Sequence, residues 1–130
     1  METLTYHFNL ILTFDKDINI EKLESLIGIK AYKKIHLKDS LFGEDNKKTA
    51  KIWFKSEDFS NLNTFETIEK YLLNIKENFK DIPHILKEFS GEFAFQLVFN
   101  KINERPIIEL TTKSIEILQQ IGASFSVDFI

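Results

Sequence analysis

Residues 5–28 read TYHFNLILTFDKDINIEKLESLIG, and this stretch carries the pattern that decides the fold. Its first ten residues place aromatic or branched apolar side chains at every second position, which is typical of a β-strand. After a polar turn the apolar side chains change to helical spacing, with Asn19 as the N-cap and Gly28 as the residue that stops the helix. The stretch therefore predicts a strand over residues 5–14 followed by a helix over residues 20–27.

The same order of elements returns at the C-terminal end of the chain. The pattern predicts a strand over residues 93–99, a helix over residues 112–121 capped by Thr111 and stopped by Gly122, and a last strand over residues 124–130. Both helices end in the dipeptide Ile-Gly. Two such β–α–β units predict parallel strand pairs, because a short helical crossover returns the chain in the same direction.

The middle of the chain supplies the remaining elements. We expect strands over residues 31–37 and 49–55, a long helix that begins near Asn63 with a capping-box pattern, and a short helix that starts around Pro83 and ends at Gly91.

The expected architecture is one α+β domain that covers residues 1–130. Two ferredoxin-like β–α–β units form one mixed sheet, helices pack on it, and a long helical segment is inserted between the units.

Composition excludes several classes of protein. The chain has no cysteine, so disulfides and thiolate chemistry are absent, and with no signal peptide or membrane span expected we place it in the cytoplasm. The net charge is −3, lysines are interspersed with acidic residues along most of the chain, and Arg105 is the only arginine. These features argue against direct binding to nucleic acid.

No pattern of catalytic or ligating residues emerges. The three histidines lack the spacing of metal ligands, and we interpret them as two surface imidazoles and one hydrogen-bonded internal one. The four glycines form no phosphate-binding loop. Ser40 lies near Asp39 and His36 in sequence, but its position in a loop favours a solvated polar side chain over a member of a catalytic triad. We therefore expect no enzyme activity, no cofactor and no metal.

Two acidic pairs, Glu44-Asp45 and Glu57-Asp58, are the clearest candidates for a docking surface. Adjacent acids usually point apart and stay solvated, which disfavours a general acid/base pair. Acids at the rim of an interface steer association with a basic partner.

Three apolar residues leave alternatives open. Leu41 and Phe42 stand in the charged segment 38–48, either as a plug that tucks onto the sheet or as a partner-binding tip. Trp53 is the sole tryptophan, and it belongs either to the core or, if exposed, to an interface.

The C-terminal run LTTKSIEILQQIGASFSVDFI resembles the closing segment of a bacterial family of domains of unknown function, in which a helix turns through Leu/Ile-Gly-Ala into a terminal strand. LIGI (26–29) and KIWFKSE (51–57) match the family's first turn and its tryptophan strand. The chain departs from the family at Ala31, where members tend to have proline, and at residues 38–40, where they tend to have Lys-Gly-Asp. The match is carried by these residues: Leu118, Ile121, Gly122, Ala123, Val127, Asp128 and Phe129.

Some members of the family that this chain resembles lie in toxin–immunity islands, including contact-dependent growth inhibition systems. The resemblance therefore implies a function in such a system. On that basis we expect an immunity protein that binds a cognate bacterial toxin, foremost a basic nuclease, and occludes its active site. The alternative is a small-molecule-binding regulatory domain of the ferredoxin-like type. The residues expected to bind the partner are Asp39, Leu41, Phe42, Glu44, Asp45, Glu57 and Asp58.

Overall fold

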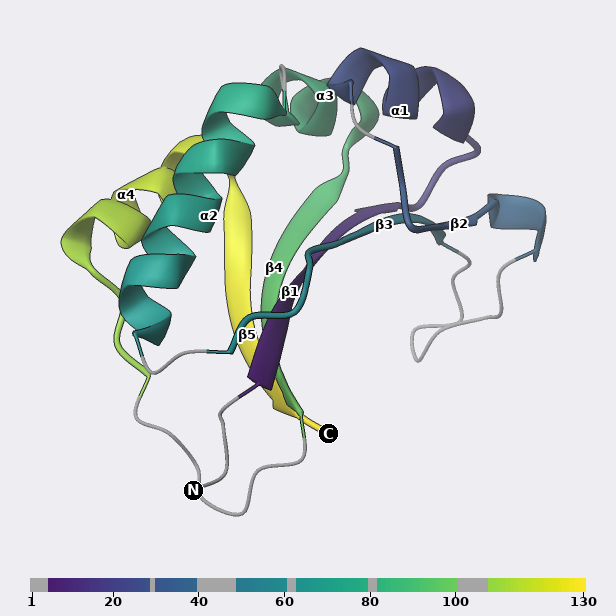
Figure 1. Ribbon diagram of the computed structural model, residues 1–130. Helices are drawn as coiled ribbons and strands as arrows, with labels where there is room; N and C mark the ends of the chain where they lie inside the picture. The colour runs from purple at the N-terminus through teal and green to yellow at the C-terminus, as the bar shows by residue number, and fades with distance from the viewer. Residues whose placement is uncertain (1–4, 29, 40–48, 61–62, 80–81, 101–107) are drawn as a thin grey trace.

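The computed structural model describes residues 5–28, 30–39, 49–60, 63–79, 82–100 and 108–130 (Figure 1). No helix within these ranges is both long and apolar enough to cross a membrane. In chain order the elements are β1 (Thr5–Phe14), α1 (Ile20–Ile27), β2 (Lys33–Ile35), the 3₁₀ turn η1 (Leu37–Asp39), β3 (Ala50–Lys55), α2 (Thr64–Asn78), α3 (Ile82–Phe89), β4 (Glu92–Asn100), α4 (Thr112–Ile121) and β5 (Ala123–Phe129).

The strands form one five-stranded mixed sheet in the order β2-β3-β1-β4-β5. β1 is antiparallel to both of its neighbours, β2 is antiparallel to β3, and β4 and β5 are parallel. The predicted α+β fold is therefore confirmed. Both expected β–α–β units are present, but β3 lies between β1 and β2, whereas β4 and β5 are direct neighbours. The segment β3–α2–α3–β4 is a further split unit, with β1 between its strands, which completes a ferredoxin-like order.

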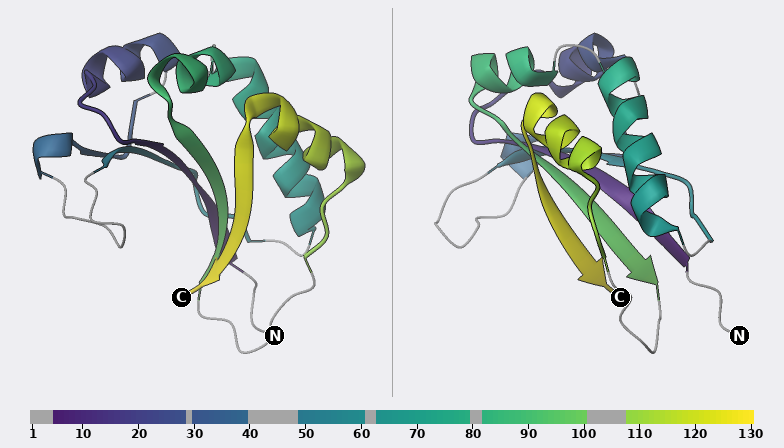
Figure 2. Two further views of the ribbon diagram at one scale, coloured as in Figure 1. Left: turned by 180° about the vertical axis from the view of Figure 1, so that it is seen from behind. Right: turned by 90° about the vertical axis from the view of Figure 1, so that its left-hand side faces the viewer.

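Within the described residues, the helices α1 to α4 all lie on one face of the curved sheet, as the three views show (Figure 1, Figure 2). Alternate side chains of β1, from Tyr6 to Phe14, are fully buried beneath them. The buried residues of α1 and α2 join the same hydrophobic core. The other face of the sheet carries the intervening side chains, and none of the helices in the described ranges covers it.

Most helix ends lie where the sequence predicts them. Asn19 accepts a hydrogen bond from the Lys22 amide at 3.0 Å, and Gly28 adopts the left-handed conformation that ends α1. Thr111 and Gly122 bound α4 in the same way. α2 does begin after Asn63, as predicted, but the side chain of Asn63 makes no capping hydrogen bond, so this half of the capping-box pattern is not formed.

Gly91 lies just past the end of α3, as the sequence predicts, and its amide donates to the Leu86 carbonyl at 2.9 Å, but it also has a packing role. The residue with positive φ after α3 is Ser90, at 53°. A Cβ atom on Gly91 would lie 2.6 Å from Cδ1 of Phe14, which is far inside van der Waals contact. The site therefore requires glycine because the ring of Phe14 packs against the backbone there.

The predicted strand over residues 31–37 is wrong in length. β2 has three residues and pairs only with residues 51–53 of β3. Before it, a carboxylate oxygen of Glu24 accepts a hydrogen bond from the Ala31 amide at 2.6 Å, which ties this segment to α1. After it, the chain turns at once into η1, so the strand is shorter than its local pattern predicts.

Candidate functional site

The chain departs from regular pairing just after β3. Asn9 pairs with Lys55, and Phe8 is hydrogen-bonded to Ser56 through its amide and its carbonyl. Tyr6, however, pairs with Phe59 through hydrogen bonds of 3.0 and 2.7 Å. Two residues of this segment therefore stand opposite the single residue His7, which defines a β-bulge.

The bulge reverses which residues face the helices. In β3 the even-numbered side chains, Ile52 and Phe54, are buried under the helices, and Trp53 lies on the other face. Past the extra residue the alternation shifts by one position, so that Glu57 and Phe59 turn toward α2. The hydroxyl of Ser56 stabilises this turn, accepting from the Phe8 amide and donating to the Glu57 carbonyl, both at 2.8 Å.

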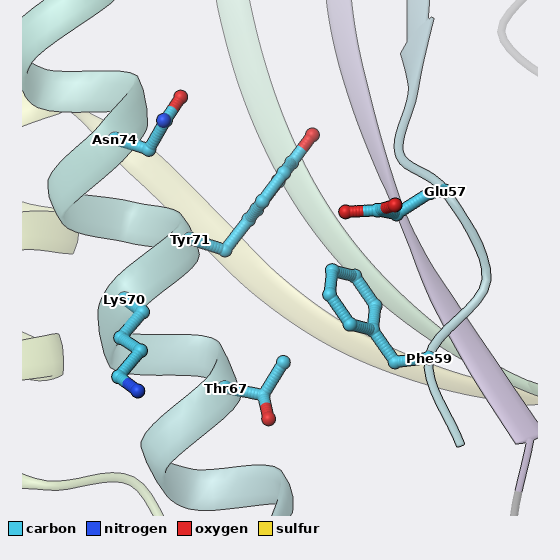
Figure 3. Close-up of a pocket in the computed structure, with 6 residues that line it drawn as sticks. All are labelled: Glu57, Phe59, Thr67, Lys70, Tyr71 and Asn74. Carbon is cyan, nitrogen blue, oxygen red and sulfur yellow. The ribbon is translucent and has the colours of Figure 1, made fainter. Parts of the chain in front are cut away.

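A groove of about 520 Å³ lies between this segment and α2. Figure 3 shows Tyr71 reaching from the helix toward the carboxylate of Glu57, with the ring of Phe59 beside them and the amino group of Lys70 directed away from Glu57. The residues that line the groove are Glu57, Phe59, Thr67, Lys70, Tyr71 and Asn74. The four from α2 recur at helical spacing and so share one face of the helix.

The groove has aromatic rings at its base, and its lining carries one carboxylate, from Glu57, and one ammonium group, from Lys70. The Tyr71 ring stacks on Phe8 with 4.7 Å between centroids, and the Phe59 ring lies 5.4 Å from that of Phe8. Burial raises the pKa of Tyr71 to about 12, and the negative charge of Glu57 adds to this rise. Both causes disfavour a negative charge on the Tyr71 oxygen, so Tyr71 keeps its proton at neutral pH.

The structure separates the acids that the sequence pairs. Glu57 lines the groove, whereas Asp58 is exposed beside the other face of the sheet, with Oδ1 3.8 Å from Nδ1 of His7. The expectation that adjacent acids point apart holds for this pair. Asp39 ends η1. The remaining predicted partner-binding residues, Leu41, Phe42, Glu44 and Asp45, lie outside the described residues.

The histidines differ in part from the sequence interpretation. His7 is internal, with 8% of its surface exposed, but its Nδ1 makes no hydrogen bond within the described part of the chain, so the prediction of a hydrogen-bonded internal imidazole is wrong. His36 and His84 lie 3.3 Å from Glu21 and Glu88 respectively. Among the described residues, no three histidine, aspartate or glutamate side chains gather as a metal site would require.

Sequence reasoning missed Tyr71 and Phe59 as site residues. Tyr71 stands beside the apolar stripe of α2, between Thr67 and Asn74, and that polar edge was the available signal. Phe59 gave no signal, because only the bulge turns it toward the helix.

One protein family matches this chain over residues 5–130, and its description is "Domain of unknown function (DUF4279)". The chain belongs to this family. The family resemblance inferred from the sequence is confirmed to that extent, and the match spans every strand and helix of the fold. No curated protein and no solved structure matches the chain.

Proposed function

We propose that this chain is a cytoplasmic immunity protein that binds a cognate bacterial toxin and neutralises it by covering the toxin's active site. In this proposal the toxin is a basic protein, foremost a nuclease, and the immunity protein acts by its surface and performs no catalysis. The observation that carries the proposal is the position of Glu57, which the bulge holds at the rim of a groove with an aromatic base.

The chemistry of the groove suits a basic side chain from the partner. Aromatic rings attract cations at their faces, and Phe59 and Tyr71 border the groove. The carboxylate of Glu57 can accept charge-assisted hydrogen bonds from a guanidinium or ammonium group. A lysine or arginine of the toxin would enter as an anchor, and the toxin surface around it would exclude water.

The experiment co-expresses this chain with the product of the neighbouring gene and measures the affinity of the complex. We expect Glu57→Gln to weaken binding by about ten- to a hundredfold, because it removes the carboxylate from a charge pair that the complex would bury. Glu116→Gln is the matched control, since it makes the same charge change at an exposed position of α4. The absence of a tight complex with any neighbouring gene product would overturn the proposal.

A second candidate is a small-molecule-binding regulatory domain. It is favoured by the volume of the groove, because about 520 Å³ lies in the range of ligand pockets. The same residues predict a cationic ligand. A thermal-shift measurement with arginine and lysine methyl esters tests this candidate: stabilisation that Glu57→Gln abolishes supports it, and no stabilisation by either ester rules out such ligands.

A further inference from the structure

The helix-free face of the sheet carries a second surface, at the end formed by β2 and β3. Lys33 pairs with Trp53 across the two strands, so both side chains lie on this face, together with Lys51 and Lys55 at alternate positions of β3. Tyr32 enters β2 with its amide bonded to the Trp53 carbonyl at 2.7 Å. We call these five residues the lysine–aromatic face.

The ammonium groups of this face are positioned by the rings. Nζ of Lys33 and Nζ of Lys51 lie 5.2 and 5.6 Å from the centre of the Trp53 ring, and Nζ of Lys55 lies 5.4 Å from the centre of the Tyr32 ring. Each contact is a cation–π interaction, which restricts where the flexible lysine side chain places its charge. Tyr32 is 69% exposed, so part of the aromatic surface remains open to a partner.

The charge of the lysine–aromatic face is not balanced within the described residues. The ion pairs there join other groups, and none of them involves Lys33, Lys51 or Lys55. Three like charges around two rings repel one another, and a partner that brings carboxylates relieves that repulsion. This face is positive, whereas the chain as a whole has a net charge of −3. The electrostatic field would therefore direct an acidic partner to this face and repel it from the negative parts of the surface.

We propose that the lysine–aromatic face docks an acidic segment of a protein partner. Its carboxylates pair with the three ammonium groups, and an apolar side chain of the segment lies against the Tyr32 ring. This surface is distinct from the groove of Glu57, which lies on the helix-covered face of the sheet, and it selects the opposite charge.

The arrangement favours carboxylates over the bases of a single-stranded nucleic acid. Bases bind such surfaces by stacking on aromatic rings. Here the ammonium groups of Lys33 and Lys51 already lie over the Trp53 ring, where a base would stack. Carboxylates can approach the same ammonium groups from solvent without displacing them.

Trp53 supplies the readout, because it is the only tryptophan in the chain. The full chain is titrated with an oligoglutamate peptide at low salt, while Trp53 fluorescence and the anisotropy of a dye on the peptide are recorded. We expect saturable binding with a change in Trp53 emission, and weaker binding as salt increases. An oligoglutamine peptide serves as the neutral control and should cause no change.

Three variants locate the binding. Lys33→Gln, Lys51→Gln and Lys55→Gln should each weaken the peptide by about two- to fivefold, the range for exposed ion pairs. Lys113→Gln, an exposed lysine on α4, makes the same charge change and should bind as the parent does. Glu57→Gln should also leave peptide binding intact, which separates this proposal from the toxin-binding one.

Three outcomes would overturn the proposal. The peptide could leave Trp53 emission and anisotropy unchanged, or the three lysine variants could bind no more weakly than Lys113→Gln. An oligodeoxythymidine that binds more tightly than oligoglutamate, with the same dependence on the three lysines, would assign the face to nucleic acid instead.

Discussion

The β-bulge places the adjacent acids Glu57 and Asp58 in different surroundings. Glu57 is held toward the aromatic groove, where it acts on Tyr71, and Asp58 stays near His7 on the other face. A bulge commonly redirects side chains beside binding sites. The candidate site therefore depends on the backbone at residues 56–59 as much as on the carboxylate itself.

His7 makes stability depend on pH. Burial lowers its pKa from 6.5, the charge of Lys55 lowers it further, and Asp58 opposes both. The folded state therefore binds the His7 proton less tightly than the unfolded state does. Above pH 6.5 the imidazole is neutral in both states and the free energy of unfolding does not change with its protonation. As the pH falls from 6.5 through the lowered pKa, protonation of the unfolded state reduces the free energy of unfolding.

Urea denaturation across that pH window checks the prediction. We expect His7→Gln to flatten the loss of stability below pH 6.5 relative to the parent chain. His84→Gln is the control, because His84 is 75% exposed on α3, 3.3 Å from Glu88, and far from the surroundings of His7. This variant should keep the slope of the parent. If the His7 variant keeps that slope too, the assignment to His7 is wrong.

At the scale of the element, α4 is attached to α2 through its own N-cap. The Thr111 hydroxyl accepts from the Ser114 amide at 3.0 Å and donates to the Glu69 carboxylate of α2 at 2.7 Å. Ser114 is fully buried beside it. The cap therefore stabilises one helix and also fixes its position relative to another.

Thr111→Ala should cost about 2 kcal/mol of unfolding free energy, because it removes a cap and a hydrogen bond to a charged group. Asn19→Ala removes only the cap of α1 and should cost about 1 kcal/mol. Chemical denaturation measures both. Thr111→Ser retains the hydroxyl and should lie close to the parent, and equal costs for the two alanine variants would mean that the Glu69 bond contributes nothing.

At the scale of the whole molecule, stacked rings connect the candidate site to the far edge of the sheet. Tyr71, Phe8, Phe95 and Phe125 stack in sequence, with centroid distances of 4.7, 5.2 and 5.9 Å. They come from α2, β1, β4 and β5, so one aromatic ladder crosses both layers of the fold. The ladder supports the ring that forms the base of the groove.

Phe95→Ala should destabilise the protein by about 3–5 kcal/mol, because Phe95 is fully buried in the middle of the ladder. Phe125→Ala, at the half-buried end on β5, should cost about 1–2 kcal/mol. Urea denaturation of both variants tests the ranking. A loss at Phe125 as large as that at Phe95 would show that β5 is as central to the core as β4.

Much of the fold could be predicted from local patterns alone. The alternation of residues 5–14, the cap at Asn19 and the stop at Gly122 depend on chemistry within a few residues, so the sequence indicated them correctly. The strand over residues 31–37 failed because pairing with β3, and not propensity, sets the length of β2. The sequence pointed to the acidic pair Glu57-Asp58, but it did not indicate the aromatic groove that Glu57 borders.

The sequence by itself determined the α+β class, the helix ends and the faces of the long strands, because each follows from spacing along the chain. Only the tertiary structure decided the strand order, with β3 placed between β1 and β2, and the bulge opposite His7. The physical reason is that a bulge is a mismatch between two strands. It has no signature in either strand alone, yet it turns Glu57 and Phe59 toward α2 and so creates the candidate site.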